Sequence, residues 1–498
     1  MITDWLIILP VIGPLCAIFF LSLFRGHRGA VTALSWATAT AGLAAGILLM
    51  QQVFIHGPQA VSLGSWPAPF GIVFAVDLLS AAMVSVTWLI GLGVLVHAAA
   101  DLDSSPSYPH FNILIHCLLA GVSGAFLTGD LFNLYVWFEV MLVASFGLMV
   151  LDAETKQIHG SLKYVFLNLI STLILLLAIG LLYGATGVLN LAALHLKIQT
   201  LPPGLTGLLT GLFLLAFSIK SALFPVFAWL PASYPTLPSS IAALFAGLLT
   251  KVGIYAMIRL FTLVLPFEGS IWQGLLIILS GMTMLTGVLG AIGQVEIKRI
   301  LSFHIISQVG YIIIGIALYT RLALAGSILY LIHHIIVKAN LFLVGGFLNR
   351  KFGSDRLSHM GGVYPAHPWV ALMFMVPAFS LAGFPPLSGF WSKFTVIRAS
   401  FESGHPLLGA TALFVGILTV YSMFKIWNSV FWERAPKAST APLTPKETSL
   451  YLIPVGTLAL ATVLIGIFAE PAFQYADLAA AQLLDPTPYI NAVLGGSQ

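Results

Sequence analysis

Charged residues are scarce in this chain. Only 8% of its 498 residues are charged, whereas 59% are hydrophobic. A soluble protein of this size carries roughly 25% charged residues, so the composition excludes an ordinary soluble domain. Uncharged apolar runs recur along nearly the whole chain, and a run of about 20 residues is long enough to cross a bilayer as a helix. Because backbone polar groups in lipid must be paired within the protein, we expect these spans to be helices.

Cysteines are almost absent, and motifs for cofactors are missing. Cys16 and Cys117 both lie in apolar runs, so neither a disulfide nor an iron–sulfur cluster is expected. No glycine-rich phosphate loop followed by Lys-Ser/Thr occurs, and we therefore expect no cofactor and no nucleotide as the energy source. A net charge of +4 does not indicate nucleic-acid binding. The run WLIILPVIGPLCAIFFLSLF lacks a preceding basic residue and is too long for a signal peptide, so we expect it to be the first span.

The apolar runs predict an all-α, polytopic membrane protein of about fourteen transmembrane helices. Strand alternation of the outer-membrane barrel type is absent. The longest loops are expected near 51–70, 184–204 and 432–449. The expected spans are 4–24, 30–50, 72–97, 110–128, 131–150, 161–183, 205–228, 237–262, 270–292, 301–319, 323–348, 369–399, 405–431 and 450–470.

The distribution of Lys and Arg predicts the orientation in the membrane. Of the 21 basic residues, 13 fall at loops on one side, 4 on the other side and 4 inside spans. Cytoplasmic loops carry the excess of basic residues, which places both termini outside. The minority side receives Lys197, Arg259, Arg321 and Arg398. Asp77 and Asp130 are expected near span starts, within reach of water or headgroups.

Five charged residues fall in the middle of spans: Glu139, Lys220, Lys251, Lys338 and Lys393. A charge there costs about 3 kcal/mol on insertion scales, so such residues face the bundle interior and are rarely without a role. Glu139 is the natural counter-ion for one lysine. A carboxylate in reversible contact with a desolvated lysine can hold and release a proton, which is the chemistry of a proton pathway. The alternative is a static ion pair that fixes helix packing.

Histidines add to this set of buried titratable residues. The segment LYLIHHIIVKANLFL carries His333, His334 and Lys338. His334 and Lys338 are four residues apart and share one helix face, whereas His333 points about 100° away. Because histidine titrates near neutral pH, such a ladder can pass protons. A metal site is disfavoured because no carboxylate or cysteine ligand lies nearby. His304, in LSFHIISQVGY, either joins a polar, water-holding track or is only packed.

Two segments, KSALFPVFAWLP and SLAGFPPLSGFWSK, each combine Phe-Pro with small residues and a lysine. Proline removes a helix hydrogen bond and frees a carbonyl. Membrane proteins tolerate such breaks where they are buried in protein or line a watery cavity. Two broken spans at matching places in two halves are typical of inverted-repeat transporters, but the two halves share too little sequence for spacing alone to establish a repeat. A simple kink remains the alternative for either segment.

Five motifs in order, KSALFPVFAWLP, SSIAALFAGLLTKVGIY, IKRILSFHIISQVGY, HHIIVKANLFLVGG and AGFPPLSGFWSKF, carry a resemblance to a known family. The chain resembles the proton-translocating antiporter-like subunits of respiratory complex I and of Mrp-type cation/proton antiporters. The resemblance covers nearly the whole chain, and the length and the FHIISQVGY form favour the Mrp branch. Complex I relatives commonly carry an acidic residue after WLP, whereas this chain reads WLPASYPTLPSS.

The resemblance implies two inverted five-helix repeats, 110–262 and 270–431, each with one broken helix. They lie between three N-terminal helices (1–109) and a C-terminal helix with its tail (432–498). It also implies that Glu139 and Lys220 form a key pair and that Lys251 links two half-channels. His334 and Lys338 would form a relay, and Lys393 would be the terminal residue. His304 and His333 complete the candidate set.

We therefore expect a proton-translocating subunit of a multisubunit Na⁺/H⁺ antiporter of the inner (plasma) membrane. It would be driven by the proton motive force, would not be an enzyme, and would assemble with other Mrp subunits. Since four lysines repel cations, the cation route is expected in a partner subunit. One alternative is a proton-pumping membrane subunit of complex I or of a membrane-bound hydrogenase. Another is a scaffold whose charges only hold helices together.

Overall fold

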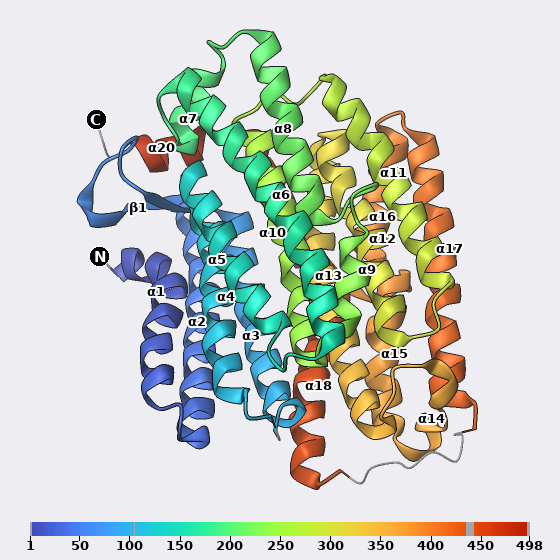
Figure 1. The fold of residues 1–498 in the computed structure, drawn as a ribbon. Coiled ribbons are helices and arrows are strands. Elements are labelled where there is room, and N and C mark those ends of the chain that lie inside the picture. The colour runs from blue at the N-terminus through green and yellow to red at the C-terminus, as the bar shows by residue number, and fades with distance from the viewer. Residues whose placement is uncertain (1, 104, 435–442, 496–498) are drawn as a thin grey trace.

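A bundle of long, nearly parallel helices dominates the computed structural model, which describes residues 2–103, 105–434 and 443–495 (Figure 1). Thirteen helices of the described residues are long and apolar enough to cross a membrane. They are α1 (Ile2–Leu23), α2 (Arg28–His56), α3 (Leu78–Asp101), α4 (Tyr108–Leu127), α5 (Leu131–Met149), α6 (Thr155–Thr186), α8 (Pro203–Ser221), α10 (Ser239–Leu263), α11 (Ile271–Ile292), α12 (Ile297–Leu318), α13 (Arg321–Phe352), α17 (Pro406–Trp427) and α18 (Pro445–Ile467).

The twelfth expected span, 369–399, consists of two half-helices. These are α15 (Pro368–Ala382) and α16 (Ser388–Glu402), of which α15 is a shorter apolar helix. The prediction of an all-α, polytopic membrane protein with about fourteen spans is thus confirmed. Both Phe-Pro segments lie in genuine interruptions rather than simple kinks, since α8 ends at Ser221 and α15 ends at Ala382.

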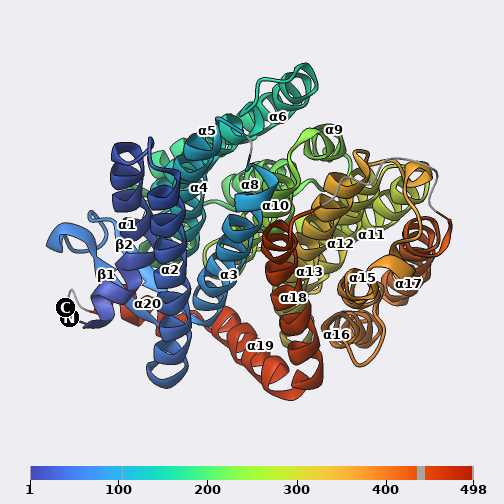
Figure 2. The ribbon, with the colours of Figure 1, turned by 90° about the horizontal axis from the view of Figure 1, so that it is seen from below.

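Three helices form the interior of the bundle. In α10, α12 and α13, 94% of the most apolar window is buried, against 33% in α1 and α2 and 39% in α17 and α18. Seen from below, the bundle is elongated, with α1 and α2 at one end, α11 and α17 at the other, and α10 and α13 between them (Figure 2). The helices that carry Lys251, Lys338 and the histidine pair are therefore among those most shielded from lipid.

Small elements that the hydropathy pattern did not predict cover the bundle ends. Strands β1 (Gln59–Ser62) and β2 (Val73–Val76) pair antiparallel within and beyond the expected loop 51–70. Short helices α7 (Leu191–Ile198), α9 (Trp229–Ser233) and α14 (Val363–Ala366) lie in connections. Helices α19 (Ala469–Leu484) and α20 (Thr487–Leu494) follow the last span, and α19 packs against α3 and α13.

Two expectations about charged residues were wrong. Asp77 was expected within reach of water or headgroups and Arg259 at a loop of the minority side, yet the two form a buried ion pair with an N–O distance of 2.7 Å and side chains only 3% and 7% exposed. Asp77 caps α3 by accepting from the backbone N–H of Ser80 at 2.9 Å. Lys298, one of the 13 basic residues counted at loops of the majority side, is buried at the start of α12, where it donates to the carbonyl of Leu237 at 3.0 Å and pairs with Asp355 at an N–O distance of 3.4 Å. In each case tertiary packing covers a helix end that hydropathy assigns to the membrane surface.

Candidate functional site

Lys220 lies where α8 ends. The helix stops because Ala222 adopts a left-handed backbone conformation, with φ of 58°. This places Lys220 in the last helical turn, where several carbonyls have no partner within the helix. The Lys220 ammonium lies over the ring of Phe138 on α5, 4.9 Å from its centroid. The break thus positions a buried lysine directly against the helix that carries Glu139.

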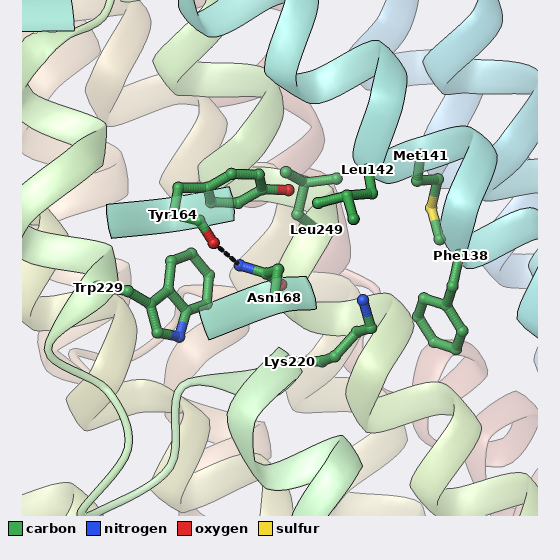
Figure 3. A pocket seen from close by; sticks show the side chains of 8 residues that line it. All are labelled: Phe138, Met141, Leu142, Tyr164, Asn168, Lys220, Trp229 and Leu249. Carbon is green, nitrogen blue, oxygen red and sulfur yellow. Dashed lines mark hydrogen bonds between the residues drawn. The ribbon is translucent and has the colours of Figure 1, made fainter. Parts of the chain in front are cut away.

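The Lys220 ammonium faces a small cavity between α5, α6, α8 and α10. Its volume is about 20 Å³, and Figure 3 shows the amine directed into it. A space of roughly 10–15 Å³ is enough for one water molecule. The cavity is lined by Phe138, Met141, Leu142, Tyr164, Asn168, Lys220, Trp229 and Leu249. On its far side, the Trp229 indole N–H donates to the carbonyl of Ile219 at 3.0 Å and ties α9 to the end of α8.

Glu139 lies beside Lys220, but the two side chains are not in contact. The carboxylate interacts electrostatically with the Lys220 ammonium. Among the described residues, however, it forms no ion pair, and its buried Oε1 has no hydrogen-bond partner. The geometry therefore corresponds to an open pair with room for water. The predicted key pair is brought together without being closed, and its role stays a prediction.

Lys251 and Lys338 form the centre of the site. Both are fully buried, and they interact electrostatically across the α10–α13 interface. The Lys251 amine donates to the carbonyl of Ala246, and the Lys338 amine donates to the carbonyl of Leu301 at 3.1 Å. Among the described residues neither lysine pairs with a carboxylate. Their amines are therefore held by backbone carbonyls.

The three predicted histidines cluster around these lysines. His334 interacts electrostatically with Lys251 and Lys338, and neither of its ring nitrogens has a hydrogen-bond partner among the described residues. His333 makes a 2.8 Å hydrogen bond through Nδ1 with the hydroxyl of Ser388, at the start of α16. His304 makes a 2.9 Å hydrogen bond through Nε2 with the hydroxyl of Ser422 on α17.

Lys393 ends the row beside the second helix break. Its amine is 3.4 Å from the carbonyl of Ala382, the last residue of α15, and 4.6 Å from the ring centroid of Tyr311. A largely apolar cavity of about 500 Å³ adjoins it, lined in part by Gly383, Phe384 and Pro385. Lys393 also interacts electrostatically with all three histidines. The structure therefore connects Lys251, Lys338, the histidines and Lys393 into one cluster.

Unpaired polar atoms line the row. Buried polar groups normally have a hydrogen-bond partner, often an ordered water. Buried atoms without a partner among the described residues include those of Ser218, Ser221, Thr250, Ser307, Gln308 and the three histidines. The arrangement can therefore hold water between the titratable groups. The described residues contain no group of three or more His, Cys, Asp and Glu side chains arranged to hold a metal ion.

Sequence reasoning missed the aromatic support of the histidines. The Tyr330 hydroxyl donates to Oε1 of Gln308, and its ring lies parallel to that of His334 with centroids 6.3 Å apart. The available signal was spacing, since Tyr330 precedes His333 and His334 by three and four residues and therefore shares their side of α13.

Known proteins match this chain along most of its length. A transmembrane family described as NADH:quinone oxidoreductase/Mrp antiporter matches residues 128–419. A D-type Na⁺/H⁺ antiporter subunit of Alkalihalophilus pseudofirmus is 45% identical over 490 residues, which are 98% of this chain and 99% of that protein. A chain of the Mrp complex from Dietzia sp. DQ12-45-1b is 32% identical, with a TM-score of 0.91 over 99% of this chain and 100% of that chain. A chain of an archaeal membrane-bound sulfane sulfur reductase is 24% identical, with a TM-score of 0.91 over 99% and 100%, and shares the fold.

Proposed function

The chain belongs to the NADH:quinone oxidoreductase/Mrp antiporter family, and from this premise we propose that it is the D-type subunit of a bacterial multisubunit Na⁺/H⁺ antiporter. The family resemblance drawn from the five sequence motifs is thereby confirmed. The chain is a multi-pass membrane protein, and its partners are the other Mrp subunits. The proton motive force drives exchange, and this subunit transports rather than catalyses a chemical conversion. Its place is the plasma membrane, with both termini outside.

The observation that carries the proposal is the row of buried lysines that lack acidic partners. Lys220 lies at one helix break, Lys393 at the other, and Lys251 and Lys338 lie between them. Glu139 adjoins the first lysine and the histidines adjoin the last three. Protons enter near one break, cross the row and leave near the other. Since the Glu139–Lys220 pair is open, closing it would hold a proton on Lys220, and opening it would release that proton along the row.

The helix breaks support two inverted repeats, 110–262 and 270–431, flanked by helices at 1–109 and by the segment 432–498. Each proposed repeat contains one interrupted span, α8–α9 or α15–α16, and one of the row's terminal lysines. Interrupted helices near the midplane are typical of transporters built from inverted repeats. The repeats place two half-channels side by side, with Lys251 and Lys338 at their junction.

Sodium follows a separate route in this proposal. A Na⁺ site needs several oxygen ligands, whereas this row presents four ammonium groups and one carboxylate. We assign the cation path to partner subunits and the proton path to this chain. Na⁺ flux through the purified chain alone would overturn that division.

The test replaces each member of the first pair, Glu139→Ala and Lys220→Ala, in the complete complex. Na⁺-dependent collapse of the pH gradient is measured in everted vesicles, with immunoblots of every subunit as a check on assembly. Exchange should be lost while assembly stays normal. The matched controls are Glu154→Ala and Lys156→Ala, which remove an exposed Glu–Lys pair with an N–O distance of 3.0 Å.

The possible results of this experiment distinguish the proposed function from its alternatives. Normal exchange in both variants would show that the pair is structural and that the proton route lies elsewhere. Loss of assembly in both would favour a scaffold. If exchange depended on a redox donor and not on Na⁺, the chain would belong to a respiratory complex, as the fold shared with the sulfane sulfur reductase allows.

A further inference from the structure

A second buried polar cluster lies outside the row, at the end of α3 near the basic loops. It consists of His97 and Asp101 on α3 and Ser240 at the start of α10. His97 and Ser240 are fully buried, and Asp101 is half-buried. His97 and Asp101 are four residues apart and share one face of α3. None of the three belongs to the proposed row of lysines.

Four hydrogen bonds join this cluster to its surroundings. Asp101 Oδ2 lies 3.0 Å from the backbone nitrogen of Ser240 and 2.8 Å from its hydroxyl. The same hydroxyl lies 2.8 Å from Nδ1 of His97. Nε2 of His97 lies 3.1 Å from the carbonyl oxygen of Leu343 on α13. The hydroxyl of Ser240 is thus the single bridge between the carboxyl group and the imidazole.

These contacts require one hydrogen more than the usual protonation states supply. A carbonyl oxygen only accepts, so Nε2 must carry a hydrogen. The contact between Nδ1 and the hydroxyl needs a second hydrogen, and the contact between the hydroxyl and Oδ2 needs a third. A neutral imidazole and a serine hydroxyl provide one each, and an ionised carboxylate provides none. The third hydrogen must lie on Nδ1 or on Oδ2.

We propose that Asp101, Ser240 and His97 form a proton-binding site that stores one exchangeable proton and takes it up at the end of the bundle near the basic loops. In one state, Oδ2 of Asp101 is protonated and donates to Ser240, which donates to Nδ1 of His97. Breaking the Oδ2–H and Oγ–H bonds while forming new Oγ–H and Nδ1–H bonds gives the other state, a carboxylate and an imidazolium. The hydroxyl keeps one hydrogen throughout, and one positive charge moves from the end of α3 to the imidazole.

The charged groups near the site mostly form ion pairs with each other. They therefore do not replace the stored proton as the partner of the Asp101 carboxyl group. Arg28 and Asp103 are 3.5 Å apart, and Arg350 and Glu447 are 3.3 Å apart. The ring of Tyr451 on α18 meets that of His97 edge-on, with centroids 4.7 Å apart, and its buried hydroxyl has no partner among the described residues. Other titratable groups at this end of the bundle include Tyr108 and His110 on α4, Lys298 on α12, Lys351 on α13 and Lys446 on α18.

The site has a route to solvent and a position facing the lysine row. Asp101 is only half-buried at the end of α3, which gives the site its access to solvent. On the inner side, Leu343 follows Lys338 by five residues, which is about 7.5 Å along α13. Between them lies Asn340, whose buried Oδ1 has no partner among the described residues. The site therefore stands between the solvent at the end of α3 and the centre of the row.

The first test detects the stored proton itself and does not depend on transport. Infrared difference spectra of the purified complete complex, recorded across a pH titration in H₂O and D₂O, report protonated carboxyl groups and imidazolium. The wild-type spectra should contain a signal that disappears in Asp101→Asn, in His97→Gln and in Ser240→Ala. Ser240→Ala leaves both titratable groups but removes the bridge, and so tests the hydrogen count with the smallest structural change. Asp103→Asn, an exposed acid two residues away, should keep the signal.

The second test concerns the role of the site, which rests on the proposed proton transport. In everted vesicles, the pH of the medium facing the basic loops is varied. The three variants should need a more acidic medium than the wild type for the same exchange rate, with assembly unchanged. Identical infrared spectra for wild type and variants would refute the stored proton. An unchanged pH profile would refute its role in supply. A stored proton together with normal exchange in Glu139→Ala and Lys220→Ala would instead overturn the proposed route and leave this site standing.

Discussion

A single methyl group added at Gly389 should disturb the proposed row of buried lysines more than one added at any other position. It lies at the start of α16, against the end of α15. A Cβ added there would lie 1.8 Å from the carbonyl oxygen of Ser380 and 2.9 Å from Cε1 of His333, whereas ordinary contacts begin near 3.4 Å. In Gly389→Ala, α16 must therefore move away from α15 by about 1.6 Å. Lys393 lies one turn further along the same helix and would move with it.

The expected loss follows from this displacement. A misplacement of about 1 Å at a reacting centre can cost about 100-fold in rate, and proton transfer has the same need for short donor–acceptor distances. We expect exchange per assembled complex to fall by about 100-fold in Gly389→Ala. Overpacking of a helix contact also costs about 1–3 kcal/mol, so the amount of assembled complex should fall as well.

The assay is Na⁺-dependent collapse of the pH gradient in everted vesicles, normalised to assembled complex on native gels. The control is Gly274→Ala in α11, where an added Cβ would meet nothing within 4 Å. That variant should exchange normally and gain a little helix stability. Exchange at the wild-type rate in assembled Gly389→Ala would refute the argument, because it would show that the position of α16 against α15 does not control transport.

Three further predictions concern stability and use the fraction of complex that stays assembled after heating. Arg259→Met should lower the free energy of unfolding by about 3–5 kcal/mol, because it leaves the Asp77 carboxylate buried and unpaired. Adding Asp77→Asn should recover most of that stability. Equal losses of stability in the single and double variants would contradict this prediction. Arg321→Gln, which removes a largely exposed ion pair with Asp477, should cost less than about 1 kcal/mol. Trp229→Phe should cost about 1 kcal/mol by removing its hydrogen bond across the helix break, and no change would show that α9 is held by packing alone.

Charges inside apolar runs made much of the site predictable. Glu139 and the four lysines stand out because hydrocarbon strongly disfavours charge, so their burial could be inferred without coordinates. The Phe-Pro segments likewise predicted breaks in two membrane spans, and both lie where the structure interrupts a helix. The spacing of His334 and Lys338 predicted their shared face. Each of these features depends only on residues within one helix or one turn.

Features that depend on distant partners could not be predicted in this way. Asp77 and Arg259 lie 182 positions apart at the ends of two apolar runs, where a charge normally reaches water. His97 and Asp101 have the spacing of a pair on one helix face, but their bridge, Ser240, comes from a helix much later in the chain. The open state of the Glu139–Lys220 pair likewise follows from how α5 packs against α8.

The pairing of proline with lysine in both broken spans has a common physical basis. A helix end leaves carbonyls without partners and carries the negative end of the helix dipole, so it can hold an ammonium group where no carboxylate is present. Lys393 uses the last carbonyl of α15, and Lys220 lies within the last turn of α8. Lys251 and Lys338 instead donate to carbonyls inside continuous helices. The ammonium of Lys393 therefore has an acceptor at a helix end, whereas that of Lys220 faces the Phe138 ring and the small cavity beside the break. In the proposed route the two terminal lysines thus differ in what holds their protonated form, and the break at Lys220 leaves room for water as its partner.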